Sequence, residues 1–154
     1  MTQIPDTGGW WVVGYGNELR SDDGAGPAVA RAVAAWEQPG VCGLACHQLT
    51  PELAEPLARA AGVIFVDAAV GEDAAPRIRE LVPAEDAPFG SHTMHPGALL
   101  ALARRLFGRA PPAWLVTLPV ANLDHGDTLS PTARAGVEWA LGEIRHRLRR
   151  KGAV

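Results

Sequence analysis

The chain has 154 residues, of which 47% are hydrophobic, and it carries a net charge of −3 at pH 7. This is the size of one domain that can bury its own core, and the charge gives no general attraction to nucleic acid. No run of about eighteen apolar residues could span a membrane, and the N-terminus lacks the pattern of a secretory signal, so we expect a cytoplasmic protein. We expect residues 1–9 to form a flexible lead-in and residues 10–150 to form a single domain.

The first predicted strand, Trp10–Tyr15, is apolar without alternation, as expected for a strand covered on both faces. It runs into a glycine-rich and acidic segment, residues 14–24 (GYGNELRSDDG), which a helical pattern follows over residues 25–36. A strand that delivers a polar turn to a helix is the usual way in which an α/β protein places chemistry at the carboxyl edge of its sheet. We therefore interpret segment 14–24 as a functional site.

Two further strands are predicted in the first half of the chain. One covers residues 41–49 and leads into a helix over residues 51–60, which Thr50 can cap. The next, over residues 63–66, is uninterrupted and apolar, and it stops at Asp67. A second carboxylate is therefore expected at the carboxyl end of a strand.

Cys42 and Cys46 lie in one predicted strand. Their Cα atoms would be about 13 Å apart there, whereas a disulfide needs less than about 7 Å. We therefore expect no bridge between them. Two buried thiols in a reducing compartment are the simplest interpretation, with a metal ligand or a reactive thiol as the alternative.

The second half of the chain begins with an alternating segment, residues 77–82, that fits a short antiparallel strand at a sheet edge. His92 then precedes Met94, which we interpret as a core or staple residue rather than a ligand. A leucine-rich helical stripe follows over residues 99–107 and ends at Gly108.

The last strand is expected over residues 114–118, and a polar loop joins it to a final helix that begins at Ser130 and Pro131. Basic residues crowd the end of this helix. We interpret them as a solvated face that complements the helix dipole, with a surface for an acidic partner as the alternative. These basic residues are Arg145, Arg147, Arg149, Arg150 and Lys151.

The alternation of strands and helices predicts an α/β fold. We expect a three-layer α/β/α sandwich of the phosphorylase/hydrolase-like kind, with a mostly parallel, twisted sheet of about five strands. Nothing in the sequence demands a partner chain, so we expect a monomer.

The glycine-rich turn does not fit a dinucleotide site. A Rossmann turn needs a third glycine where this chain has Leu19, and an acidic residue after the second strand where it has His47 and Gln48. The adjacent carboxylates of Asp22 and Asp23 would also repel a pyrophosphate. The chain has no G-x-S-x-G nucleophile elbow, so a hydrolase built on it would use water as its nucleophile.

A metal site is the remaining hypothesis. Asp23, Asp67 and His92 all fall in loops that a parallel sheet would gather along one edge. Two carboxylates and one imidazole with open positions suit a borderline divalent ion such as nickel, zinc or iron(II). Taken singly, Asp23 could instead cap a helix, and His92 could be an ordinary loop residue.

Together these residues resemble the nickel–iron hydrogenase maturation endopeptidases. The first family trait is a strand that runs into G-x-G-N and then Asp-Asp or Asp-Glu before a small residue, which is segment 14–24 here. The second trait is an apolar strand that ends in Asp-Ala, and in this chain the aspartate of that pair is Asp67. The third trait is a Ser-His pair before a Leu-rich helix, and in this chain the histidine of that pair is His92. The resemblance covers about residues 10–148 and includes the Leu-Ser-Pro of residues 129–131.

This resemblance implies an endopeptidase that recognises nickel already inserted in a hydrogenase large-subunit precursor and removes the C-terminal extension of that precursor. On the matching positions, Asp23, Asp67 and His92 would bind the nickel and make up the catalytic site. Because the substrate supplies the metal, the site should be open and weak: an enzyme that held its own nickel could not distinguish a loaded precursor from an empty one. Another divalent metal could occupy the site in a crystal.

Two departures from the family pattern bear on this prediction. Many members carry Asp-Gly-Gly-Thr after the second strand, whereas this chain has His-Gln-Leu-Thr at residues 47–50. His95 follows His92 closely and could replace or assist it.

The sequence does not assign a general base. Asp22 and Glu18 are the candidates, but a surface position is the simpler interpretation of each. A non-catalytic chaperone that binds nickel or the precursor on the same scaffold is the alternative function, and an ordinary metallohydrolase with its own ion is a third.

Overall fold

A five-stranded sheet forms the centre of the fold in the computed structural model, which describes residues 8–70, 75–85 and 94–154. The strands lie in the order β2-β1-β3-β5-β4, with parallel pairing throughout except that β4 runs antiparallel to β5 at one edge. This confirms the predicted α/β class and the mostly parallel sheet. The strands are β1 (Trp10–Tyr15), β2 (Val41–Cys46), β3 (Gly62–Ala69), β4 (Arg77–Leu81) and β5 (Ala113–Pro119).

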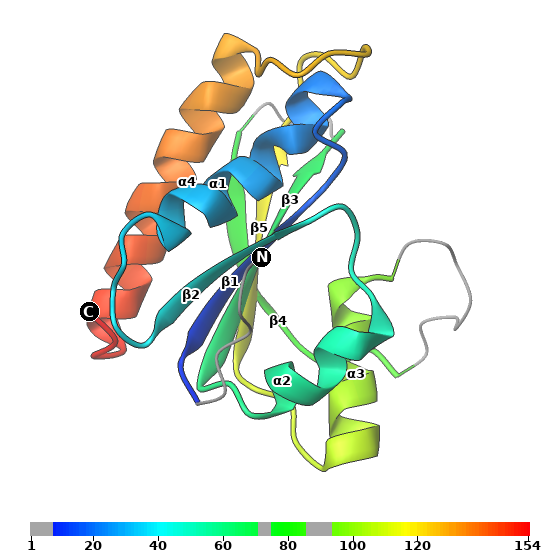
Figure 1. Cartoon of the computed structure of the whole chain (residues 1–154), viewed down its shortest axis with the longest axis vertical. Helices are drawn as coiled ribbons and strands as arrows, with labels where there is room; N and C mark the ends of the chain where they lie inside the picture. The colour runs from blue at the N-terminus through cyan, green and yellow to red at the C-terminus, as the bar shows by residue number, and fades with distance from the viewer. Residues whose placement is uncertain (1–7, 71–74, 86–93) are drawn as a thin grey trace.

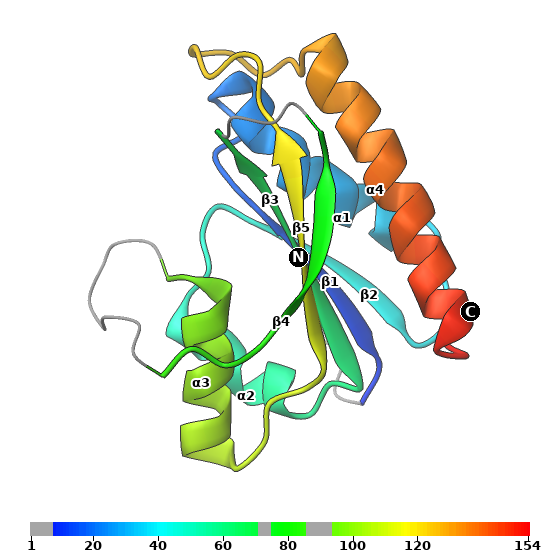
Figure 2. The same ribbon diagram turned by 180° about the vertical axis from the view of Figure 1, so that it is seen from behind.

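Helices cover both faces of the sheet, with α1 and α4 on one side and α2 and α3 on the other (Figures 1 and 2). None of the helices in the described part of the chain has the length and hydropathy needed to cross a bilayer. The helices are α1 (Ala25–Ala34), α2 (Ala54–Ala58), α3 (Pro96–Phe107) and α4 (Pro131–Arg150), with short 3-10 turns η1 (Ser21–Gly24) and η2 (Pro51–Leu53).

Successive residues of each strand serve opposite layers of the core. Trp11 and Phe65 pack in the cluster beside α2 and α3, whereas Val12 and Ile64 pack in the cluster beside α1 and α4. All four are at most 1% exposed. Burial on both faces explains why the strands appear in the sequence as continuous apolar runs, and it confirms the predicted sandwich of three layers.

The strand register gathers two polar segments at one edge of the sheet. β1 pairs with β3 from Trp10 opposite Gly62 to Gly14 opposite Val66, so both strands run toward the same edge. Asp67 follows Val66 directly, and η1 comes shortly after the end of β1. The turn after β1 and the carboxylate of β3 therefore meet at the carboxyl edge.

Helix α1 lies unusually close to the sheet because glycines line the contact. A Cβ atom added at Gly43 would lie 2.0 Å from the backbone oxygen of Ala30, and one added at Gly14 would lie 1.9 Å from the oxygen of Gly26. Only glycine leaves room for this approach. The contacts hold α1 against β2 and fix the start of α1, which directly follows η1, beside the end of β1.

Several element boundaries differ from the sequence prediction. β3 does not stop at Asp67 but continues to Ala69, because Asp67 still pairs through its backbone with Thr117 of β5. β2 ends at Cys46 rather than at residue 49, and α1 ends at Ala34. The helix predicted over residues 51–60 is instead the turn η2 followed by the short helix α2, and the Thr50 side chain makes no capping hydrogen bond.

The two long helices begin and end where the sequence indicates. Pro96 occupies the first turn of α3, and Gly108 ends it with a φ of 78°, a left-handed conformation that glycine adopts without strain. Ser130 caps α4 by accepting a hydrogen bond at its Oγ from the Ala133 N–H, 3.1 Å away. These caps confirm both predicted helices, and the antiparallel edge strand predicted over residues 77–82 is β4.

Candidate functional site

A cleft of about 430 Å³ opens at the carboxyl edge of the sheet, where η1 and the end of β3 meet. It contains Asp23 and Asp67, so the structure brings together two of the three predicted site residues. The third, His92, lies outside the described residues, and so does the Ser-His pair to which it belongs. The other residues that line the cleft include Tyr15, Asn17, Arg20, His47, Gln48 and Met94.

Backbone geometry holds Asp23 in place. The Asn17 N–H donates a hydrogen bond of 2.7 Å to Asp23 Oδ2, which ties the carboxylate to the turn that precedes it. Gly16 has a φ of 150°, and a Cβ atom there would lie 2.0 Å from the backbone oxygen of Asp23. The glycine of the G-x-G-N pattern is thus required by close approach to the acidic residue, not by a phosphate.

Asp67 is a perturbed carboxyl group. Burial and then the negative charge of Asp23 raise its pKa, hydrogen bonds from the Tyr15 hydroxyl and the Ala68 N–H offset part of the rise, and the net value is about 6. Burial and then Asp67 itself raise the pKa of Tyr15, so this phenol stays protonated and donates. Two carboxylates that repel each other in a partly buried cleft favour a bound cation, which would lower the free energy of the charged pair.

Asp22 is fully buried, so the predicted surface position is wrong. Its Oδ2 accepts hydrogen bonds from the Ala121 N–H at 2.8 Å, the Asn122 N–H at 3.0 Å and the Ser130 hydroxyl at 2.7 Å, and its Oδ1 accepts from the Ser130 N–H at 2.7 Å. Burial alone would raise the pKa of Asp22, but the hydrogen bonds from Ser130, Ala121 and Asn122 outweigh it and lower that pKa. A carboxylate engaged in this way is a structural anchor and not a general base.

Ser21 adds a second set of bonds between η1 and the loop that joins β5 to α4. Its hydroxyl donates to the Asp124 backbone oxygen at 2.7 Å, and its N–H donates to the Gly126 oxygen at 2.8 Å. Arg20 forms an isolated parallel bridge with Gly126. The position of Asp23 therefore depends on a distant loop, since Ser21 and Asp124 are 103 residues apart in the sequence.

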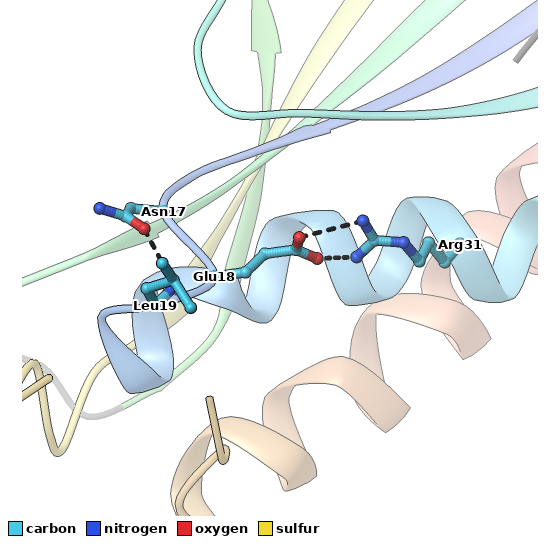
Figure 3. Close-up of polar contacts among 4 residues, drawn as sticks. All are labelled: Asn17, Glu18, Leu19 and Arg31. Atoms are coloured by element: carbon cyan, nitrogen blue, oxygen red, sulfur yellow. Dashed lines mark hydrogen bonds and ion pairs between the residues drawn. The ribbon is translucent and has the colours of Figure 1, made fainter. Parts of the chain in front are cut away.

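Glu18 is paired with a cation rather than free (Figure 3). Arg31 of α1 binds its carboxylate at two points, one of them a hydrogen bond from Nη2 to Oε2 of 3.0 Å. Asn17 Oδ1 accepts from the Leu19 N–H at 3.0 Å and shapes the turn that carries Glu18. Both Glu18 and Arg31 line a second cleft of about 430 Å³ that shares His47 with the first.

His95 acts as a helix cap. Its Nδ1 accepts a hydrogen bond of 3.0 Å from the Gly97 N–H, which assigns the proton of the neutral ring to Nε2. Burial, and then the charge of Arg79, lower the pKa of His95. In this form neither ring nitrogen has a free lone pair for a metal ion, which argues against the replacement of His92 by His95.

The cysteines are unpaired, as predicted. Burial raises the pKa of both thiols, so neither is an activated thiolate. Among residues 8–70, 75–85 and 94–154, no group of three or more His, Cys, Asp or Glu side chains gathers around a metal position. Met94, expected in the core, packs against the α2 and α3 cluster and also borders the cleft.

Two residues of the cleft are not predicted from the sequence as site residues. Tyr15 is predicted only as the end of a strand, although its place between two glycines at the sheet edge is a signal for a functional hydroxyl. The sequence gives His47 no predicted role, and the structure puts it in the wall of the cleft beside Gln48 and Leu49. The segment after β2 that lacks an acidic residue therefore forms part of the site itself.

Several solved structures share this fold over nearly the whole of the chain. The hydrogenase maturating endopeptidase HybD from E. coli matches with a TM-score of 0.75 and 26% identity over 94% of each chain. The hydrogenase 2 maturation peptidase from Thaumarchaeota archaeon SCGC_AB-539-E09 matches with a TM-score of 0.70 and 23% identity over 95% of this chain and 99% of that one. The NiFe hydrogenase maturation protease HycI from Thermococcus kodakarensis KOD1 matches with a TM-score of 0.71 and 20% identity over 95% of this chain and 96% of that one.

A comparison with protein-family models gives no match, and a comparison with curated proteins gives none either. The structural matches confirm that the chain shares its fold with several hydrogenase maturation proteases over about 94% of its length. An identity of 26% or less establishes the shared fold and leaves the activity of this chain to be tested.

Proposed function

Because this chain has the fold of the nickel–iron hydrogenase maturation proteases, we propose that it is an endopeptidase that recognises nickel in a hydrogenase large-subunit precursor and removes the C-terminal extension of that precursor. The observation that carries this proposal is the pair of carboxylates, Asp23 and Asp67, in one cleft at the carboxyl edge of the sheet. We propose His92 as the third ligand from the sequence pattern. The protein would act as a monomer in the cytoplasm.

The carboxylate pair suits a metal that arrives with the substrate. Asp67 has a pKa of about 6, so its own charge develops only as the pH approaches neutral, and that charge is repelled by Asp23 when no cation is present. Such a pair binds a divalent ion weakly when it supplies few of the ligands, and the precursor would supply the rest. Docking through nickel would bring the scissile peptide bond to the cleft, where water attacks it.

Neither of the two acidic residues suggested by the sequence, Asp22 and Glu18, is suited to act as the general base. The Asp22 carboxylate is buried in hydrogen bonds, and the Glu18 carboxylate is paired with Arg31. Each would need to lose these partners before it could take a proton from water. The chemistry therefore depends on the nickel ligands, on the substrate, or on both.

The experiment that tests the proposal mixes the purified protein with its cognate precursor, loaded with nickel or free of it, and follows the precursor by mass spectrometry. We expect loss of the C-terminal extension only from the loaded precursor. Equal cleavage of both forms would contradict nickel recognition, and no cleavage of either would contradict the protease activity.

A non-catalytic chaperone that binds nickel or the precursor is the second candidate. The observations that favour it are the occupied carboxylates of Asp22 and Glu18, and the presence of His47 and Gln48 in the cleft wall where many family members have an acidic residue. It predicts a nickel-dependent complex of the two proteins with no change in precursor mass. Size-exclusion chromatography of the same mixtures separates it from the protease.

A further inference from the structure

A separate hollow lies at the other end of the sheet from the carboxylate cleft. It has a volume of about 410 Å³, and Trp10 and Trp114, at the starts of β1 and β5, form one wall. Their rings stack with centroids 5.6 Å apart at an angle of 29°. The last turns of α4 form the other wall, and Figure 1 shows that end of α4, in red, at the same end of the molecule as the start of β1, in blue.

Three cations line this hollow, and none of them has an acidic partner among the described residues. The Arg147 guanidinium lies 6.0 Å from the centroid of the Trp114 ring, and Lys151 Nζ lies 5.3 Å from it. Within the described residues, no side-chain hydrogen bond or ion pair engages Arg147, Arg150 or Lys151, and Arg147 Nε is buried with no acceptor. A buried guanidinium N–H without an acceptor is costly, so this atom marks a place where an acceptor is missing.

Capping of the helix does not account for these cations. Backbone groups already satisfy the last carbonyls of α4: the Lys151 N–H donates to Arg147 at 3.1 Å, the Gly152 N–H donates to Arg149 at 3.0 Å, and the Ala153 N–H donates to Leu148 at 2.8 Å. The side-chain donors of the hollow are therefore not needed at the helix end. They remain available to a ligand from outside the chain.

We propose that this hollow, bounded by Trp10, Trp114, Arg147, Arg150 and Lys151, binds an acidic peptide segment of a partner protein. Arginine and lysine donors bind carboxylates through charge-assisted hydrogen bonds, and the positions from 147 to 151 span about 6 Å along the helix, which matches carboxylates on neighbouring side chains of a peptide. The half-buried Trp114 ring offers apolar contact between them. A single compact phosphate fits less well, because it is too small to reach cations that are spread over about 6 Å of the helix.

The surface is separate from the proposed active site. Trp10 begins β1 and Tyr15 ends it, so the strand alone puts about 17 Å between the hollow and the carboxylate cleft. The proposal therefore stands or falls independently of the proposed protease function. Glu143 also lines the hollow and marks the end of its positively charged part. Its carboxylate would repel further acidic residues of a peptide that extended past this point.

The test measures binding of a labelled peptide that alternates pairs of glutamate with leucine, by fluorescence polarisation with the whole chain. We expect saturable binding that weakens with salt and falls at least about tenfold in the double variant Arg150→Glu/Lys151→Glu. The control is Arg149→Glu, which reverses a charge on the same helix turn outside the hollow and should change affinity less than about twofold. A peptide with lysine in place of glutamate should not bind, and tryptophan emission should change on binding of the acidic peptide.

Three outcomes would overturn the proposal. One is no binding of the acidic peptide to the native chain. Another is equal loss of affinity in the Arg149→Glu control, which would mean that the net charge of the helix end, rather than the hollow, attracts the peptide. The third is displacement of the peptide by an equimolar amount of inorganic phosphate, which would make the hollow a site for small anions.

Discussion

At the scale of single residues, two adjacent aspartates of one motif have opposite roles. Asp22 is fully buried and anchors a loop, while Asp23 lines the cleft. They lie in a 3-10 turn, in which successive side chains point about 120° apart, so one turns into the protein as the other turns out. The sequence could predict the acidic pair, but not this division, because the direction of each side chain depends on how η1 packs.

Removing the charge of Asp67 should stabilise the metal-free protein. Its pKa is raised from 3.8 to about 6, so the folded state holds a proton that the unfolded state has lost, and charging it at neutral pH costs on the order of 3 kcal/mol. We expect Asp67→Asn to raise the free energy of unfolding by about 1–3 kcal/mol at pH 7.5.

The sign of this effect follows from linkage. A carboxyl group whose folded pKa is raised stabilises the fold below its unfolded pKa and loses that contribution as the pH rises toward 6. Urea denaturation of both proteins should therefore give equal stability below pH 3.8 and a growing difference up to about pH 6. An Asp67→Asn protein that is less stable than the native chain at pH 7.5 would contradict the account.

At the scale of elements, the Asp22 anchor joins η1 to the loop before α4. Loss of this carboxylate would leave the N–H groups of Ala121, Asn122 and Ser130 without their acceptor. We expect Asp22→Ala to lower the free energy of unfolding by about 3–5 kcal/mol, as measured by urea denaturation. Asp124→Ala, which removes an exposed acid from the same loop, should change it by less than about 0.5 kcal/mol.

The effect of Asp22 should depend on pH in the opposite direction to that of Asp67. Hydrogen bonds lower its folded pKa, so its stabilisation is present above the unfolded value of 3.8 and is lost as the pH falls through the lower folded value. The difference in the free energy of unfolding between the native chain and Asp22→Ala should therefore become smaller in strong acid. A difference that stays constant into strong acid would show that the packing of Asp22, rather than its charge, stabilises the fold.

The close contact between α1 and the sheet leads to a second prediction about how the elements pack. A Cβ atom at Gly43 would overlap the backbone of Ala30 at 2.0 Å, so Gly43→Ala should push α1 from β2 and lower the free energy of unfolding by about 2–4 kcal/mol. Gly142, inside α4, has nothing within 4 Å of such an atom. Gly142→Ala should therefore raise the free energy of unfolding by about 0.5–1 kcal/mol through helix propensity, and thermal unfolding of both variants measures the contrast.

At the scale of the whole molecule, the features set by local sequence were predictable. The apolar runs of β1 and β5, the glycine after α3 and the serine cap of α4 all lie where the pattern indicates, because each depends on nearby residues. The extension of β3 past Asp67 was not predictable, since it depends on backbone pairing with β5, a distant strand. The ends of β2 and α2 depend in the same way on packing.

The candidate site also combines features that the sequence could predict with features that depend on distant parts of the chain. The placement of Asp23 and Asp67 at one sheet edge follows from the rule for parallel strands, which the sequence alone could supply. The perturbation of Asp67 requires its burial, its nearness to Asp23 and the hydroxyl of Tyr15, which only the folded chain brings together. The capping role of His95 was likewise hidden, because a histidine before a helix can be a ligand or a cap until its hydrogen bonds are known.

The central claim is that the carboxylate pair acts on a nickel-loaded precursor. The most direct test incubates that precursor with the native chain, with Asp23→Asn, and with Glu55→Gln, which alters an exposed ion pair on α2 that does not line the cleft. The mass of the precursor after a fixed time reports cleavage. The account predicts complete processing by the native chain and by Glu55→Gln, and at least a hundredfold slower processing by Asp23→Asn, a loss of roughly 3 kcal/mol in transition-state stabilisation. Native-like processing by Asp23→Asn would contradict it.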